Sequence, residues 1–116
     1  MTVEKATALL TEWQRRLGLM DWTIELHTDL FELSIDDAVG CTSYIETSKT
    51  AYIEILSEKA YGDRVAPYDF EKTLVHELLH LKFCFLSESD NDLQNRITHQ
   101  LIDDMARALV NAKRRK

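Results

Sequence analysis

The amino-acid sequence predicts an α+β fold, in which a small sheet of about three strands packs against an N-terminal, a central and a C-terminal helix. Apolar residues recur at helical spacing near the start of the chain and in its second half, and three short segments between residues 22 and 56 have the character of strands. No linker, repeat or low-complexity segment divides the 116 residues, so we expect one domain over residues 1–116. The apolar share of 45% is ordinary for a soluble globular protein.

The first helix is predicted to run from Val3 to about Leu17. Thr2 is a candidate N-cap before it, and Gly18 belongs to the residue type that commonly ends a helix. Its apolar residues fall on one face, which we expect to lie against the core: Ala6, Leu9, Leu10, Trp13 and Leu17.

The first strand is predicted over residues 22–27, where apolar and polar residues alternate. The side chains expected to face the core are Trp22, Ile24 and Leu26. His27 would then lie on the outward face of the sheet. Residues 29–38 carry no clear pattern and receive no assignment.

A β-hairpin is predicted from residues 40–47 and residues 51–56, with residues 48–50 in its turn. In the second arm Ala51, Ile53 and Ile55 share one face, expected to be the core face, and Tyr52 and Glu54 share the other. Residues 57–68 hold the only proline of the chain and are predicted to form a loop.

The second helix begins after residues 67–69, where Pro-Tyr-Asp provides a start signal with Asp69 as the N-cap. Neither Gly nor Pro interrupts the following run from Phe70 to Leu86. Four apolar residues repeat along this run at helical spacing: Leu74, Leu78, Leu81 and Phe85. The same helix carries the most informative pattern of the chain, His76-Glu77-Leu78-Leu79-His80.

The two histidines of this motif are four residues apart and therefore lie on one face of the helix, one turn from each other. Their imidazoles are placed to bind one metal ion. Glu77 lies beside them without having to be a ligand, and its carboxylate is placed to take a proton from a water molecule on the metal. A zinc hydrolase needs this combination, so the motif predicts a catalytic zinc site.

The last helix is predicted from Asp92 to about Asn111, after a polar break at residues 87–91. Five apolar residues form its main stripe, which we expect to face the core: Leu93, Ile97, Leu101, Met105 and Ala108. Ala106 and Val110 offer a second apolar face, and His99 lies on that side of the helix.

The net charge of −6 argues against binding to nucleic acid, because an acidic chain repels phosphate groups. Four basic residues are concentrated at 113–116, where they favour the end of a helix electrostatically. No apolar stretch is long enough to span a membrane, and residues 1–5 lack the pattern of a secretory signal, so we expect a cytoplasmic protein. Cys41 and Cys84 form no disulfide framework and are expected to be small core residues.

The order of these elements resembles that of the zincin metallopeptidases. It is most similar to the smallest of them, the minigluzincins, and to compact metallopeptidases that are common in phages and prophages. Three stretches carry the resemblance: Leu19–Ile24, Thr73–Leu81 and Ile102–Leu109. The resemblance implies a zinc-dependent peptidase whose peptide or protein substrate lies extended along an edge strand, here Ala51–Ile55, by strand addition.

A catalytic zinc ion needs a third protein ligand and an open position for water. In the gluzincin pattern this ligand is a glutamate on the following helix, and an acidic residue one turn later supports a motif histidine. This chain has no glutamate after Glu88, but His99 stands at the matching position and Asp103 follows one turn later. We therefore predict that His76, His80 and His99 bind Zn²⁺ and that Asp103 supports one of the motif histidines.

Three alternatives for the third ligand stay open at this point. Glu88 lies in the segment directly after the motif helix, and Asp104 lies on the main apolar stripe of the last helix. Cys84 follows His80 by four residues and could face the same side of the helix. Each alternative would place a different side chain beside the motif histidines.

Glu77 is predicted to be the general base of a peptidase, which takes a proton from water and passes it to the leaving amine. A further donor must stabilise the oxyanion, and Tyr52, Tyr61 and Tyr68 are candidates between which the sequence does not decide. Two other functions stay open: a zinc-binding interaction module that docks through its basic tail, and a peptidase that is latent as an isolated domain. The sequence identifies neither a preferred cleavage site nor an oligomeric state.

Overall fold

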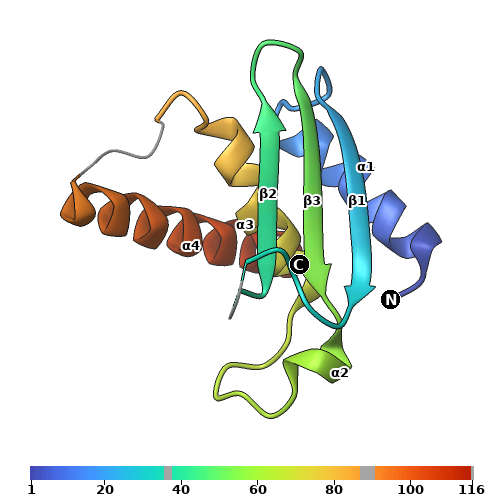
Figure 1. The fold of residues 1–116 in the computed structure, drawn as a ribbon. Helices are drawn as coiled ribbons and strands as arrows, with labels where there is room; N and C mark the ends of the chain where they lie inside the picture. The colour runs from blue at the N-terminus through green and yellow to red at the C-terminus, as the bar shows by residue number, and fades with distance from the viewer. Residues whose placement is uncertain (36–37, 87–90, 116) are drawn as a thin grey trace.

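The computed structural model describes residues 1–35, 38–86 and 91–115. The chain forms a three-stranded sheet with helices packed against one of its faces, which confirms the predicted α+β class (Figure 1). The elements in chain order are α1 (Val3–Arg16), β1 (Thr23–Leu30), β2 (Gly40–Ile45), β3 (Thr50–Leu56), α2 (Glu58–Tyr61), α3 (Phe70–Lys82) and α4 (Asp92–Arg114). Among the described residues, no helix combines the length and the apolar character that crossing a membrane requires.

Helix α1 agrees with its prediction at both ends. The Thr2 side chain accepts a hydrogen bond from the backbone N–H of Lys5, which satisfies one free donor of the first turn. Leu17 is the C-cap, and Gly18 follows with a φ of 71°, a conformation that suits glycine. The buried residues of the helix are Ala6, Leu10 and Trp13.

The strands are arranged in the order β1-β3-β2, with β1 parallel to β3 and β2 antiparallel to it. The segment Ala51–Ile55 therefore lies in the central strand, and its predicted position at the edge of the sheet is wrong. The alternation of a strand indicates which side chains face the core, but it does not indicate which strands are its neighbours. Here β3 pairs with β2 on one side and with β1 on the other, so that β1 and β2 form the two edges of the sheet.

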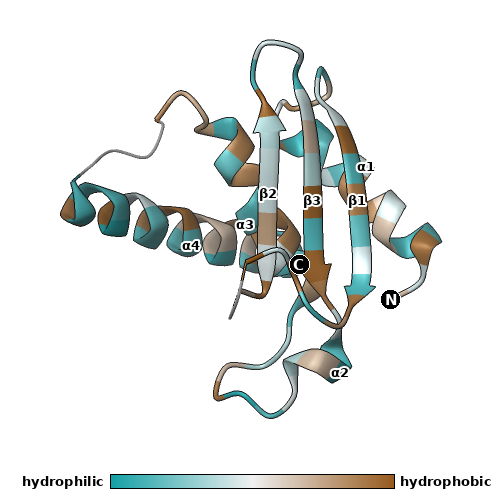
Figure 2. Ribbon diagram, viewed as in Figure 1, coloured by the Kyte–Doolittle hydropathy of each residue, from teal (hydrophilic) through white to brown (hydrophobic). Residues whose placement is uncertain are grey.

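The core lies between the sheet and the helices. As predicted, Ala51, Ile53 and Ile55 of β3 are buried on the face toward the helices. They pack in one apolar cluster with residues of α1, α3 and α4. Figure 2 shows the hydrophobic segments along β3 and the helices. The residues that α3 buries are Phe70, Leu74, Val75, Glu77, Leu78, Leu79 and Leu81, which makes it the most deeply buried helix.

Two boundaries in the second half of the chain differ from the prediction. The segment 57–68 was expected to be a loop, but it contains the one-turn helix α2, whose N-cap is Ser57. Helix α3 ends at Lys82, four residues before Leu86, because the N–H groups of Cys84 and Leu86 turn back to carbonyls only three residues earlier. Phe85 is therefore exposed, although its spacing predicted a place on the buried face.

Helix α4 faces the core with the opposite side to the one predicted. Its buried residues are Ile102, Ala106 and Val110. The predicted stripe is exposed, and we call its four large residues, Leu93, Ile97, Leu101 and Met105, the outer stripe of α4. The helix has two apolar faces, and ion pairs accompany the one that packs: Lys113 and Arg114 pair with Glu71 and Asp69 at the start of α3.

Candidate metal centre

Helix α3 holds His76 and His80 side by side at the surface of the core. The opposite face of the helix is anchored by Leu74, Val75 and Leu78, which have no exposed area. This packing fixes the rotation of α3, so both histidines are half-buried and point to the same side, with ring centroids 5.1 Å apart. The motif spacing thus produces the paired arrangement that the sequence predicted.

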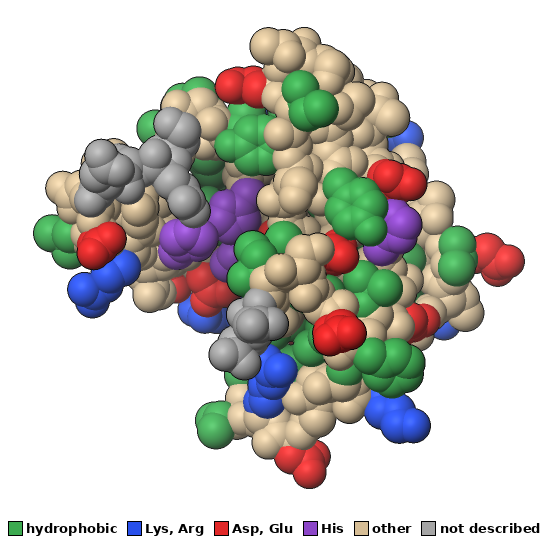
Figure 3. All heavy atoms as spheres, in the orientation of Figure 1, with side chains coloured by type: hydrophobic (Ala, Val, Ile, Leu, Met, Phe, Trp, Pro, Cys, Tyr) green, Lys and Arg blue, Asp and Glu red, His purple; other side chains and the backbone are tan. Residues whose placement is uncertain are grey.

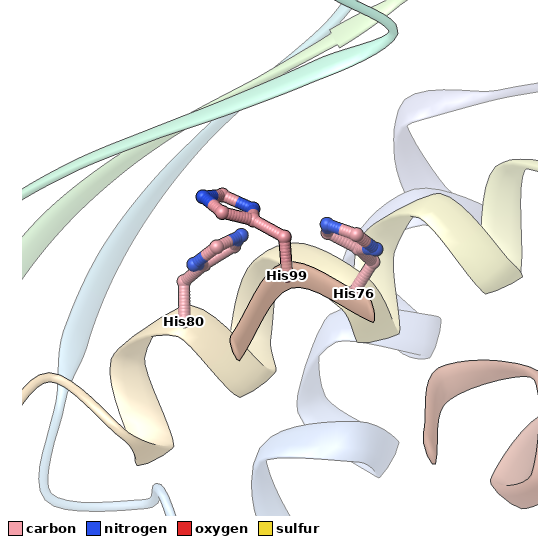
Figure 4. Close-up of side chains that lie close together, drawn as sticks. All are labelled: His76, His80 and His99. Carbon is pink, nitrogen blue, oxygen red and sulfur yellow. The ribbon is translucent and has the colours of Figure 1, made fainter. Parts of the chain in front are cut away.

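Helix α4 places His99, which follows His80 by 19 residues, beside the two histidines of α3. Its ring centroid lies 5.1 Å from that of His80. Nitrogen atoms of His76, His80 and His99 all lie within 4.8 Å of one another, and the three rings face a common space (Figure 4). Within the described part of the chain, no other group of three His, Cys, Asp or Glu side chains comes this close together.

The cluster fits a zinc ion in donor type and in scale. Three imidazoles suit zinc, and in a tetrahedral site with bonds of about 2.0–2.1 Å the ligand nitrogens lie about 3.4 Å apart. No fourth ligand atom joins the cluster among the described residues. Three protein ligands with one position left open are typical of catalytic zinc sites, whereas structural sites usually have four.

Asp103 supports the cluster from α4. Its Oδ1 atom lies 3.3 Å from Nδ1 of His76, so the other ring nitrogen of this histidine is left for a metal. Arg107 contacts the second carboxylate oxygen at 2.7 Å. A carboxylate on the outer nitrogen fixes the orientation of a ligating imidazole and makes it more basic. The predicted support of a motif histidine by Asp103 thus has a matching contact in the structure.

Burial keeps the two α3 histidines neutral. Burial and the neighbouring imidazoles lower the pKa of His80 to about 4. The pKa of His76 is also lowered, because burial outweighs the opposing effect of the Asp103 carboxylate. Only a neutral imidazole offers a lone pair to a metal, so these rings have the form that metal binding requires at neutral pH.

Glu77 is buried beside the cluster, with 6% of its surface exposed. Thr42 on β2 donates a hydrogen bond of 2.6 Å to its Oε1 atom. Burial raises the pKa of Glu77 to about 7, although this hydrogen bond acts in the opposite direction. A carboxylate with a raised pKa next to a candidate metal site is suited to general acid–base chemistry.

Gly40 gives the Glu77 carboxylate its space. A Cβ atom at residue 40 would lie 2.7 Å from Oε2 of Glu77 and 2.9 Å from Cγ2 of Thr73, closer than real contacts allow. Sequence reasoning did not identify either Gly40 or Thr42, because each meets Glu77 only through the packing of β2 on α3. The one available signal was a glycine at the first position of a predicted strand, where a close backbone approach is common.

A cleft runs across the cluster between β2 and the two helices. His76, Glu77 and Gly40 line two adjoining cavities of about 280 and about 350 Å³. The larger cavity also contains His80 and His99 and has apolar walls, which include Tyr44, Phe83 and Ile102. In Figure 3 the histidine side chains gather in a hollow at the surface, where a ligand can approach them.

None of the alternative third ligands that the structure describes belongs to the histidine cluster. Cys84 directs its Sγ atom to a carboxylate oxygen of Glu46 at 3.5 Å, and it is not part of the histidine cluster. Asp104 is exposed and pairs with Arg107 on its own helix. Glu88 lies outside the described residues. His27 stacks on Tyr52 on the outward face of the sheet, far from the cleft in the fold.

The three tyrosines differ in their relation to the cleft. Tyr52 projects from the outward face of the sheet. Tyr68 donates a hydrogen bond of 2.6 Å to the carbonyl of Leu56, and burial raises its pKa to about 12. Tyr61 alone of the three lines the cleft, and its hydroxyl donates to the carbonyl of Ala66 at 2.6 Å. Tyr61 is therefore the only one of these candidates that lies within reach of the site.

Comparison with protein-family models, with curated proteins and with solved structures gives no match for this chain. The resemblance to the zincins therefore stays a prediction from the sequence. What bears on function is the geometry of the site: a histidine cluster, a supporting carboxylate and a buried glutamate in one cleft.

Proposed function

We propose that this protein is a zinc-dependent peptidase in which Glu77 is the general base. The observation that carries the proposal is the cluster of His76, His80 and His99, whose nitrogens lie within 4.8 Å of one another directly beside buried Glu77. A structural zinc site gains nothing from a buried base next to it, whereas a hydrolytic site requires one.

The residues of the cleft take distinct roles in this reaction. His76, His80 and His99 would hold the metal, and Asp103 would orient His76. A zinc ion held there supplies a Lewis acid, which makes a coordinated water more acidic and polarises a carbonyl group. Glu77 accepts the proton of the attacking water and later gives it to the leaving amine.

The substrate would lie along β2, the edge strand beside the cleft. Gly40 lines both cavities, and Thr42 and Tyr44 of the same strand line the larger one. Among the described residues, β2 pairs in the sheet only with β3, so an extended peptide would add as a further strand at the other edge of β2. Such a peptide would cross the cleft next to Glu77.

Metal analysis and a protease assay test this proposal together. The purified protein should contain about one zinc ion per chain and should cleave an unfolded protein substrate. Glu77→Gln keeps the shape of the side chain but cannot take a proton, so it should lower hydrolysis by about 10²–10⁴-fold and leave the zinc content unchanged. Glu58→Gln, the same change on the exposed surface of α2, should leave both unchanged.

Two results would count against the proposal. An active preparation that keeps its rate after Glu77→Gln would exclude the general-base mechanism. A wild-type protein that binds zinc but cleaves no peptide would favour the interaction module. In such a module the basic tail would offer fewer charges to a partner than its sequence suggests. Lys113 and Arg114 already form ion pairs with Glu12, Glu71 and Asp69.

A further inference from the structure

The outer stripe of α4 is an exposed apolar surface in the part of the chain that the structure describes. Its four side chains are spaced at four-residue intervals and are 38–61% exposed. From Leu93 to Met105 the stripe covers 12 residue steps, about 18 Å of helix at 1.5 Å per residue. It lies roughly opposite the buried residues of the same helix, and in Figure 1 the first half of α4 extends past the edge of the sheet. A long helix that is apolar on two opposite faces suits two packing partners, and α3 is only one.

We propose that the outer stripe pairs with the same stripe of a second copy of this chain, in an antiparallel arrangement with a twofold axis near residues 99–100. A surface that binds its own copy must be complementary to itself. About this axis, Ile97 of one protomer lies opposite Leu101 of the other, and Leu93 lies opposite Met105. The middle of the stripe, around Ile97 and Leu101, therefore meets large aliphatic side chains of the other protomer.

The charges beside the stripe fit the same axis. Arg96 precedes Ile97 and Asp104 precedes Met105, so both lie along the same flank of the stripe. In an antiparallel pair this flank meets its own copy, and Arg96 then faces Asp104 of the other protomer twice in one dimer. Both side chains are exposed, and Asp104 accepts hydrogen bonds from Gln100 and Arg107 of its own helix at 3.1 and 3.2 Å. A parallel pair would not bring these opposite charges together.

The small area of the contact is typical of a weak, transient dimer. Ridges formed by residues four apart cross at roughly 50°, which limits the contact to the middle turns of the helices. Such a contact falls near or below the low end for specific interfaces, about 1,200 Å² in total. We therefore expect a dimer that dissociates on dilution, with a Kd on the order of tens of micromolar.

Sedimentation analysis of the full chain tests the proposal. From about 1 µM to about 1 mM, a range that brackets a weak interface, the wild type should change from monomer to dimer. Ile97→Glu together with Leu101→Glu should keep the chain monomeric over this range. Val65→Glu, which also replaces an apolar residue by glutamate but at a fully exposed position outside α4, should behave as the wild type.

Charge exchange tests the antiparallel geometry separately. Arg96→Glu alone places two like-charge contacts in the dimer, and Asp104→Arg alone does the same, so each should raise the Kd by about tenfold. The double variant restores opposite charges and should return the Kd to within about threefold of the wild type. Because both residues are exposed, circular dichroism should report an unchanged fold for all three variants.

Three results would overturn the proposal. A wild type that stays monomeric over the whole range would mean that the stripe is not a surface for a second copy and would leave it to a different partner. A dimer that survives both glutamates in the stripe would place the interface elsewhere. A double charge variant no better than the single ones would exclude the antiparallel arrangement.

Discussion

Helices α3 and α4 both contribute to the histidine cluster, but they are held in the protein in different ways. Seven of the 13 residues of α3 are buried, compared with three of the 23 residues of α4. All three buried residues of α4 come after His99, which is itself exposed. Two ligands thus belong to a helix that the core holds in place, and the third belongs to a helix segment with little support.

This difference indicates how the site forms. The α3 histidines are preorganised by packing that does not depend on a metal, so they provide most of the initial affinity. His99 completes the site, and a metal bound there would in turn hold the first half of α4 against the cleft. Substitutions on the two helices should therefore differ in the size of their effect.

The largest effect is expected from the α3 histidines. Changing either His76 or His80 to Ala should abolish the retention of zinc during gel filtration, because two ligands on separate helices do not form a tight site. Elemental analysis of the purified variants measures this directly. His27→Ala, which removes the one histidine outside the cluster, should keep about one zinc ion per chain. Full zinc occupancy in a variant that lacks both α3 histidines would refute the site.

A graded effect is expected from α4. His99→Ala should weaken zinc binding by more than about 100-fold, because it removes a ligand but leaves the preorganised pair. Asp103→Asn should weaken it by about 10–100-fold, because it alters only the orientation and basicity of His76. Competition with a chelator of known affinity gives both values. Equal losses for these two variants would mean that His99 is not a ligand.

The two helices also show what the sequence could and could not predict. The cap at Asp69 and the uninterrupted apolar spacing predicted α3 and the pairing of its histidines, because these are local properties. The orientation of α4 was not predictable in this way. Its more regular apolar stripe is the exposed one, and the face that packs contacts residues far away in the chain; Arg114, for example, contacts Asp69, 45 residues earlier.

In the sheet, too, the sequence predicted the local pattern but not the contacts between distant segments. The alternation in β3 predicted that Ile53 and Ile55 face the core, and this is confirmed. Its central position depends on pairing with β1, about 27 residues earlier in the chain, which alternation does not encode. The approach of Gly40 and Thr42 to Glu77 depends in turn on where β2 lies. The folded structure was therefore needed to identify Gly40 and Thr42 as residues of the site.

A smaller effect is expected where β2 meets α3. Thr42→Val removes the hydrogen bond to Glu77 and leaves a buried carboxyl group without its partner, at a cost of about 1–3 kcal/mol. Thr42→Ser keeps the hydroxyl and should restore most of this stability. Gly40→Ala should displace the Glu77 side chain, so it should lower hydrolysis without removing zinc. Thermal unfolding and zinc content, measured on the same samples, separate these effects; equal stability of the Val and Ser variants would count against the role of the hydrogen bond.

The smallest effect is expected at the other end of α4. The Arg114 guanidinium lowers the pKa of Asp69, and the contacts of Glu71 with Lys113 and Trp13 outweigh its burial and lower its pKa as well. Folded-state pKa values below the unfolded ones mean that this stabilisation is complete above about pH 4.5 and is lost as the pH falls further. Arg114→Met should therefore cost about 1 kcal/mol at pH 7 and much less at pH 3. Denaturant unfolding at both pH values measures the change, and an equal loss at pH 3 and pH 7 would exclude the ion pair as its source.

The coordination sphere of the zinc-loaded protein tests the central claim most directly. A crystal structure of the metal complex should place zinc about 2.0–2.1 Å from one nitrogen each of His76, His80 and His99, with the remaining position open to water and Glu77 close by but not coordinated. A zinc ion bound by Glu88, Cys84 or Asp104 in place of His99, with His99 directed to solvent, would contradict the assignment of the third ligand. A structure with no metal at the α3 histidines would contradict the account as a whole.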